Sequence, residues 1–263
     1  MTTGLQAAQT QTARLETREA ETQEQVSPDV LSARELVRDQ LLADILHGEI
    51  DPLPTEEQPL NESTVMRRYG QGSRMPVRMA LAVLAGEGLF RQRARHGYWL
   101  VDYDIDDMEQ IRMMRARIEA MVAAALCERE IASGGTDDAP VAPLRLEAWR
   151  EALKVHDAMG KIVRGLDELQ VDAELKAGFA DLDTLLHVLL ARAGGYDMAA
   201  RHIVEWRNQM RIFALQNKLT HDSHALSTAH EEHTQIIDAI KRADRPSAAL
   251  LARTHVENVL ARR

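Results

Sequence analysis

The stretch SRMPVRMALAVLAGEGL, residues 73–89, decides the N-terminal fold. Ser73 can cap the first turn of a helix, and Pro76 lies in that turn, where its missing N–H costs little. The apolar residues that recur at helical spacing are Val77, Leu81 and Leu84. This spacing predicts a helix over about residues 73–86 that is anchored in a core by one face and leaves its N-terminal end free.

The segments on either side of this helix complete a known order of elements. The expected elements are, in chain order, a helix over about 33–47, a helix over about 61–69, the helix at 73–86, and strands near 89–93 and 98–101. The two strands are joined around His96 and Gly97, which is typical of a hairpin. Helix, helix, turn, helix and hairpin is the order of a winged helix-turn-helix. We expect this domain over residues 33–104, preceded by a disordered or flexible tail over residues 1–32.

Charge is distributed unevenly along the chain. Lysine and arginine number 32 against 41 acidic residues, a net charge of -9, which argues against a protein that binds polyanions over its whole surface. Between Ser63 and Tyr98, however, Glu87 is the only acid. The basic residues of that stretch are Arg67, Arg68, Arg74, Arg78, Arg91, Arg93 and Arg95. A local excess of arginine is typical of a DNA-reading module, although charge alone fits a solvated surface equally well.

The arginines coincide with the positions where a winged helix contacts DNA. The N-terminal end of a recognition helix enters the major groove, and the wing lies along the adjacent backbone or minor groove. The predicted DNA-binding residues are Ser73, Arg74, Arg78, Arg93, Arg95, His96 and Gly97. The expected partner is double-stranded operator DNA. The alternative is a winged helix that serves as a protein-interaction adaptor.

The chain beyond Asp104 has helical periodicity and no competing strand pattern. Helices are expected over about 106–132, 145–164, 171–193, 197–219, 227–243 and 246–262. We therefore expect residues 105–263 to form an all-helical domain for effector binding and dimerisation. The predicted fold class is mainly α, an N-terminal winged helix-turn-helix followed by an all-α helical bundle.

Four side chains in the helical part form a candidate metal site. Asp183 and His187 are four residues apart on a predicted helix, so both project from one face, while His233 and His255 lie on two later helices. Such a set suits a divalent Zn, Ni, Mn or Fe ion. Spacing alone is weak evidence, because a single histidine is more often a surface or hydrogen-bonded core residue. The other histidines of this region, His221, His224 and His230, are expected in a loop or facing solvent.

A metal-dependent enzyme with an accessory winged helix is the other alternative. The segment from His230 to His233 has neither metalloprotease spacing, and the sequence contains no G-x-S-x-G elbow or phosphate-binding glycine loop. The single cysteine, Cys127, has no evident base beside it. We therefore do not expect an enzyme. Without an apolar run of about 20 residues or a signal peptide, we expect a cytoplasmic protein with no membrane partner.

Ordered motifs in both halves resemble one family of bacterial regulators. ILHGEI (45–50), L-N-E (60–62), SRMPVR (73–78) and RHGYWLV (95–101) resemble the GntR family. The pattern D...H, then EH..I..AI, then a later histidine resembles the FadR-type (FCD) ligand domain of those regulators. One additional residue precedes Ser73, and Ser63 replaces a common arginine, so the operator sequence is not transferable.

The resemblance implies a ligand-responsive transcription regulator. It implies a homodimer that binds a palindromic operator, represses a metabolic operon and is relieved by its ligand. In many members of this family the positions of Asp183, His187, His233 and His255 hold a divalent metal that helps to bind a small carboxylate effector. Arg115, in an R..IE motif, fits an anchor for the effector carboxylate, although an ordinary salt bridge is an equal alternative.

Overall fold

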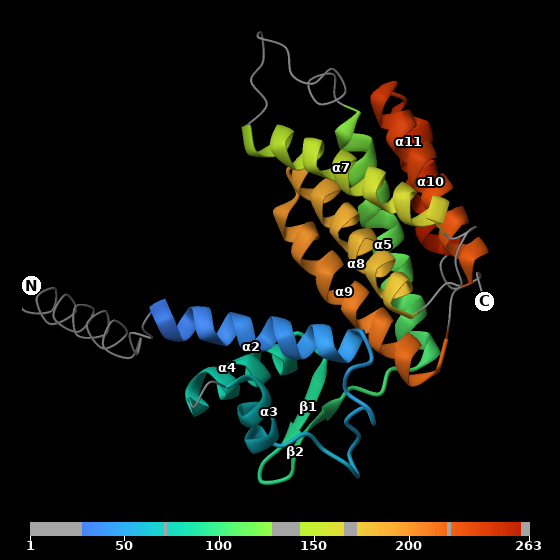
Figure 1. Ribbon diagram of the computed structural model, residues 1–263. Coiled ribbons are helices and arrows are strands. Elements are labelled where there is room, and N and C mark those ends of the chain that lie inside the picture. The colour runs from blue at the N-terminus through green and yellow to red at the C-terminus, as the bar shows by residue number, and fades with distance from the viewer. Residues whose placement is uncertain (1–27, 71–72, 128–142, 166–172, 220–221, 259–263) are drawn as a thin grey trace, which may run out of the picture.

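The computed structural model describes residues 28–70, 73–127, 143–165, 173–219 and 222–258 (Figure 1). The N-terminal elements are α2 (Pro28–Leu46), α3 (Glu62–Tyr69), α4 (Arg74–Gly86), β1 (Phe90–Arg93) and β2 (Gly97–Leu100). The C-terminal elements are α5 (Ile105–Leu126), α7 (Pro143–Gly165), α8 (Ala173–Ala193), α9 (Asp197–Gln216), α10 (Ser223–Lys241) and α11 (Arg245–Asn258). The predicted fold class, a winged helix followed by a helical bundle, is confirmed. No helix within the described ranges combines the length and apolar character needed to cross a bilayer.

The N-terminal part packs three helices against a small hairpin. The residues that form its core include Leu41, Ile45, Val65, Leu81, Leu84 and Leu100. Strands β1 and β2 pair antiparallel, from Phe90 opposite Leu100 to Arg93 opposite Gly97. The side chains predicted to anchor α4 are therefore buried, while Arg74, Met75 and Arg78 near the start of α4 are exposed.

Glycine is required at position 97, the first residue of β2, by the backbone conformation and by a close neighbouring segment. Its φ is +125°, and a Cβ at this position would lie 2.8 Å from the carbonyl oxygen of Leu60. The close approach lets Leu60 pair with Tyr98, through N–H···O distances of 2.7 Å and 2.9 Å in the two directions. A side chain at Gly97 would separate the segment before α3 from the wing.

Several helices begin or end away from their predicted bounds. Helix α10 begins at Ser223 because the Asp222 side chain accepts a hydrogen bond of 2.8 Å from the backbone N–H of Ala225. Helix α2 begins at Pro28, inside the segment predicted as a tail, and proline is favoured at a first helical position. Residues 1–27 and the predicted end of the first bundle helix lie outside the described residues. The proposed domain boundaries stay a prediction.

Helix α9 belongs to the bundle and also contacts the winged helix. Its Ile212 side chain is fully buried in the winged-helix core. Gln209 donates from Nε2 to the Glu87 carbonyl oxygen at 3.0 Å, and Gln216 donates to that of Val101 at 3.1 Å. Figure 1 shows the C-terminal end of α9 reaching the level of α2. The two parts of the chain therefore share a packed interface.

Candidate functional site

The structure brings the four predicted metal ligands together inside the bundle. Asp183 and His187 come from α8, His233 from α10 and His255 from α11, and one ligand atom of each lies within 4.8 Å of the others. His233 Nε2 lies 3.2 Å from His187 Nε2 and 3.0 Å from His255 Nε2. The Asp183 Oδ1 atom lies 3.3 Å from His233 Nε2. The three imidazoles are buried, so three helices converge on one small polar centre.

Two carboxylates outside this set fix the histidine tautomers. His187 Nδ1 lies 2.5 Å from Glu119 Oε2, and His255 Nδ1 lies 2.6 Å from Glu232 Oε2. A carboxylate accepts, so each Nδ1 carries the proton and each Nε2 presents a lone pair to the centre. Both lone pairs face the Nε2 atom of His233. A neutral His233 ring carries one N–H proton, which cannot form a full hydrogen bond with both neighbouring nitrogens.

The donor set fits a divalent cation. Asp183 Oδ1 and His233 Nδ1 are buried and have no hydrogen-bond partner among the described residues. Buried polar atoms are normally paired, so an unpaired carboxylate oxygen beside converging imidazole lone pairs indicates a missing positive partner. Three imidazole nitrogens and one carboxylate oxygen are ligands for Zn, Ni, Mn or Fe.

The electrostatics favour the protonation states that metal binding needs. Burial, together with the neighbouring His187, lowers the pKa of His255 to about 4, although Glu232 opposes this shift. Burial also lowers the pKa of His233 well below its ordinary value. Burial raises the pKa of Glu119, but Arg115 and His187 outweigh it and hold that pKa well below its usual range. At neutral pH the imidazoles of His233 and His255 are therefore neutral and Glu119 is ionised, as ligation requires.

Arg115 is buried behind the cluster rather than exposed to a cavity. Its Nε donates to Glu119 Oε1 at 2.9 Å, and Nη1 lies 3.2 Å from the Met210 sulfur. Glu119 thus links Arg115 to His187. In this arrangement Arg115 orients a metal-ligand partner, and its role as an effector anchor stays a prediction.

A small cavity lies beside the histidines. Its walls include Glu119, His187 and His255, with the remainder apolar, for example Leu126 and Ile236. Its volume is about 20 Å³, which is close to what a single water molecule requires. An organic acid therefore enters only if the surrounding helices move apart.

Sequence reasoning missed three residues that complete this centre. Glu119 lies within the R..IE motif and Glu232 directly precedes His233, so both were in recognised patterns without an assigned role. Arg207 of α9 contacts Asp183 Oδ2 and donates to Thr184 Oγ1 at 3.0 Å. No spacing in the sequence relates Arg207 to Asp183, because the contact joins two helices.

The prediction for His230 is wrong. His230 lies inside α10, is half-buried, and stacks on His156 of α7 with ring centroids 4.4 Å apart. The stack is formed where α10 packs against α7, and Gly160 leaves room for the His230 ring. His224 is exposed, in agreement with the prediction. His221 lies outside the described residues.

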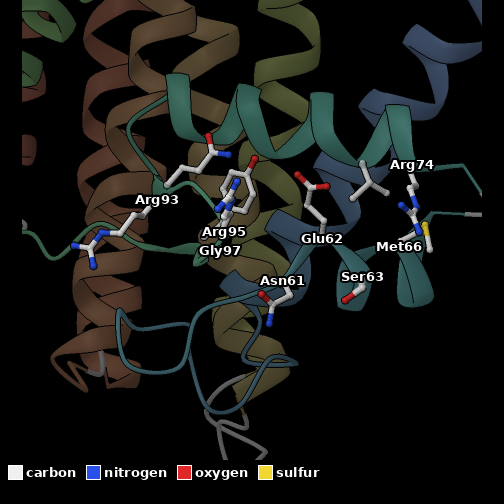
Figure 2. A pocket seen from close by; sticks show the side chains of 11 residues that line it. Asn61, Glu62, Ser63, Met66, Arg74, Arg93, Arg95 and Gly97 are labelled. Atoms are coloured by element: carbon white, nitrogen blue, oxygen red, sulfur yellow. The ribbon is translucent and has the colours of Figure 1, made fainter.

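The second candidate site is a groove of about 430 Å³ on the winged helix. Figure 2 shows it between the start of α3, the start of α4 and the wing. Of the predicted DNA-binding residues, those that line it are Arg74, Arg93, Arg95 and Gly97. Ser73 and Arg78 are exposed at the start of α4. Asn61, Ser63 and Gln92 also line the groove, and sequence reasoning did not assign them to it.

Several charged side chains on or near this groove form ion pairs or hydrogen bonds within the chain. Arg38 of α2 binds both carboxylate oxygens of Glu87 at 2.8 Å, so the single acid of the basic stretch is already neutralised. Arg93 pairs with Glu56 at 2.5 Å, and His96 Nε2 lies 2.7 Å from the Glu56 carbonyl oxygen. Arg78 lies 3.5 Å from Glu62 and keeps 65% of its side chain exposed. Glu62 and Glu56 therefore offset part of the positive charge, while Arg74 and Arg78 stay exposed on α4.

Comparisons with known proteins agree with this architecture. Residues 143–258 match the model of the FCD domain family. Two solved structures are similar over nearly the whole chain. Escherichia coli McbR/YncC has a TM-score of 0.63 at 14% identity, covering 87% of this chain and 95% of its own. A GntR protein of Rhodococcus sp. RHA1 has a TM-score of 0.61 at 16% identity, covering 89% and 97%. A search of curated proteins found no match.

Residues 143–258 therefore match the FCD family, and the chain shares its fold with these two solved structures over 87% and 89% of its length. The resemblance inferred from the sequence is confirmed. The match begins at residue 143 and does not include α5, although α5 supplies Glu119 to the metal cluster.

Proposed function

We propose that the protein is a DNA-binding transcription regulator that represses a metabolic operon and responds to a small organic acid. The observation that carries the proposal is the exposed N-terminal end of α4, where Arg78 is exposed and Arg74 lines the same groove as the wing residues Arg93 and Arg95 (Figure 2). On the winged-helix fold this end reads the major groove, and arginine can form bidentate bonds to guanine. Residues 63–98 hold seven arginines and a single acid, a local excess of positive charge of the kind that phosphate contacts require.

The cluster of Asp183, His187, His233 and His255 supports the sensing part of the proposal. These residues would hold a divalent metal ion, which supplies a Lewis-acid site for a carboxylate oxygen. Glu119 and Glu232 keep the imidazoles of His187 and His255 in the ligating tautomer.

A sensor is favoured over a metal-dependent enzyme by the same carboxylates. A hydrolytic site needs a general base that can reach a metal-bound water. Glu119 and Glu232 both accept hydrogen bonds from imidazole Nδ1 atoms, and Asp183 is engaged by Arg207. The acidic groups around the cluster are therefore committed to orienting ligands.

The active form is proposed to be a homodimer on a palindromic site. Two recognition helices that read equivalent half-sites multiply a modest affinity for each. Entry of an effector beside the histidines requires helices to separate, which provides a structural response to ligand.

DNA binding is tested by fluorescence anisotropy with the DNA upstream of the protein's own gene. We expect salt-dependent binding that the Arg74→Ala variant weakens strongly. The matched control is Arg150→Ala, which removes an exposed arginine from α7 and should leave affinity unchanged. Equal losses in both variants, or no binding at moderate salt, would contradict the proposal.

A further inference from the structure

We propose that the contact between α8 and α9 transmits the state of the metal cluster to the winged helix. The contact consists of two carboxylate–guanidinium pairs, Asp183 with Arg207 and Asp181 with Arg211. We call these two pairs the α8–α9 seam. The inference rests on the proposed function, because it names the route by which metal or effector binding reaches the DNA-reading domain.

The inner pair of the seam belongs to the metal cluster. Arg207 contacts Asp183 Oδ2, while Oδ1 of the same carboxylate faces the imidazoles of the cluster. Arg207 is buried, and its Nε also donates to Thr184 Oγ1. A cation and Arg207 would therefore share a single carboxylate.

The outer pair reaches the winged helix directly. Arg211 follows Arg207 by four residues, so both project from one face of α9. Its Nη1 lies 2.5 Å from Asp181 Oδ1, and the other oxygen of Asp181 lies 2.7 Å from His47 Nε2. His47 directly follows α2. Asp181 therefore bridges α9 to the end of a winged-helix element.

The remainder of α9 is packed into the same domain. Ile212, next to Arg211, is fully buried in the winged-helix core, and Gln209 bonds to the turn that follows α4. Buried cores resist gradual deformation, so a displacement of α9 must carry these contacts with it or break them.

The direction of the effect follows from charge. A divalent cation held by Asp183 would add positive charge next to the buried Arg207. It would also compete with Arg207 for the Asp183 carboxylate, which compensates the charge of Arg207. Arg207 is then held less strongly, and α9 is free to shift along α8. The shift reaches His47 and Ile212, which alters the placement of the recognition helix relative to the bundle.

The experiment uses the full chain, Zn²⁺ alone as the probe, and hydrogen exchange as the readout. We expect Zn²⁺ to change the exchange rates of amides in residues 41–46 and 87–89 by at least about fivefold, the lower end of typical allosteric coupling. The Arg211→Gln variant should still bind Zn²⁺ but reduce that change to less than about twofold. Asp181→Asn, which removes the bridge from the other side, should behave in the same way.

The matched control is Arg201→Gln. Arg201 lies on α9, is exposed, and donates to the Met198 sulfur of the same helix, so this variant should respond to Zn²⁺ like the unmodified protein. Zn²⁺ binding without any change at residues 41–46 and 87–89 would overturn the inference, as would a full response in both seam variants. Failure to bind Zn²⁺ would overturn the metal site of the proposed function together with the inference. Failure to bind DNA would contradict the proposed function and leave the exchange result to decide the seam.

Discussion

The DNA-reading face and the metal cluster use charged side chains in opposite ways. On the winged helix, Arg74 and Arg78 extend into solvent at the start of α4, and their nearby partners are few and exposed. In the bundle, Glu119 and His187 are almost completely enclosed and bonded to each other. In the proposed function, the first site binds a large polyanion and the second a small cation.

This difference determines whether a substitution changes the affinity for a ligand or the free energy of unfolding. Exposed charges contribute little to the free energy of unfolding, so changing them affects what the protein binds. Buried charges that lose one partner destabilise the fold, because the other charge is left uncompensated. Substitutions in the two sites should therefore have different signatures.

The largest expected effect is the stabilisation of the bundle by metal. With Zn²⁺ at about 100 times its dissociation constant, the free energy of unfolding should rise by about 3 kcal/mol. His233→Ala removes the imidazole at the centre of the cluster and should abolish this rise, measured by denaturant titration with and without chelator. His202→Ala, at an exposed position on α9, should preserve it. A rise of equal size in the His233 variant would show that zinc binds elsewhere.

The second effect concerns the recognition helix. Arg78→Ala should weaken operator binding by about 1–3 kcal/mol, the value of a bidentate base contact. Its free energy of unfolding should change by less than about 0.5 kcal/mol, because the side chain is exposed. Arg78→Lys keeps the charge but not the planar fork, so it should recover binding to unrelated DNA better than binding to the operator. Full operator affinity in the lysine variant would assign Arg78 to a phosphate.

The third effect concerns Glu119, a carboxylate that is not one of the four predicted metal ligands. Glu119→Gln should lower the affinity for Zn²⁺ about 10- to 100-fold, because His187 loses the carboxylate that fixes its tautomer. Isothermal titration calorimetry measures the loss. Glu231→Gln, an exposed change on α10, should leave the affinity unaltered. Unchanged binding by the Glu119 variant would mean that the Glu119–His187 contact is purely structural.

The smallest effect is on pH dependence. Burial lowers the pKa of both His156 and His230, with Arg164, Lys241, Asp238 and Glu231 as the charged groups around them. Between the lowered pKa values and the unfolded value of about 6.5, the unfolded chain binds more protons, so stability falls as pH falls through that range. His156→Gln should make the metal-free protein less sensitive to a change from about pH 7 to about pH 5. An unaltered pH profile would exclude the stacked pair as a contributor.

Local pattern, together with the family resemblance, was sufficient to predict most of the fold and the four side chains that the structure brings together. The spacing of Val77, Leu81 and Leu84 placed α4, and the four-residue separation of Asp183 and His187 placed two ligands on one helix face. The residues of other helices that contact these four side chains were not predictable in this way. Glu119 and Arg207 act through contacts between helices, and nothing in a single sequence shows which helices become neighbours.

The same reason explains the histidine that was misplaced. The predicted helix over about 227–243 already included residue 230, but the sequence did not show that α7 would cover this side of the helix. His230 stacks on His156, a contact between two helices that local spacing does not reveal. The packing of α7 against α10 therefore decides that this side chain is enclosed.

Ile212 has a consequence for attempts to exchange sensors between regulators. A winged helix cut after residue 104 would lose the side chain that fills part of its core and would expose an apolar depression in its place. Chimeric proteins that join this winged helix to a foreign helical bundle will fold properly only if the new bundle supplies an apolar side chain that fills the same space as Ile212. The two parts are therefore encoded in separate stretches of sequence but are not interchangeable modules.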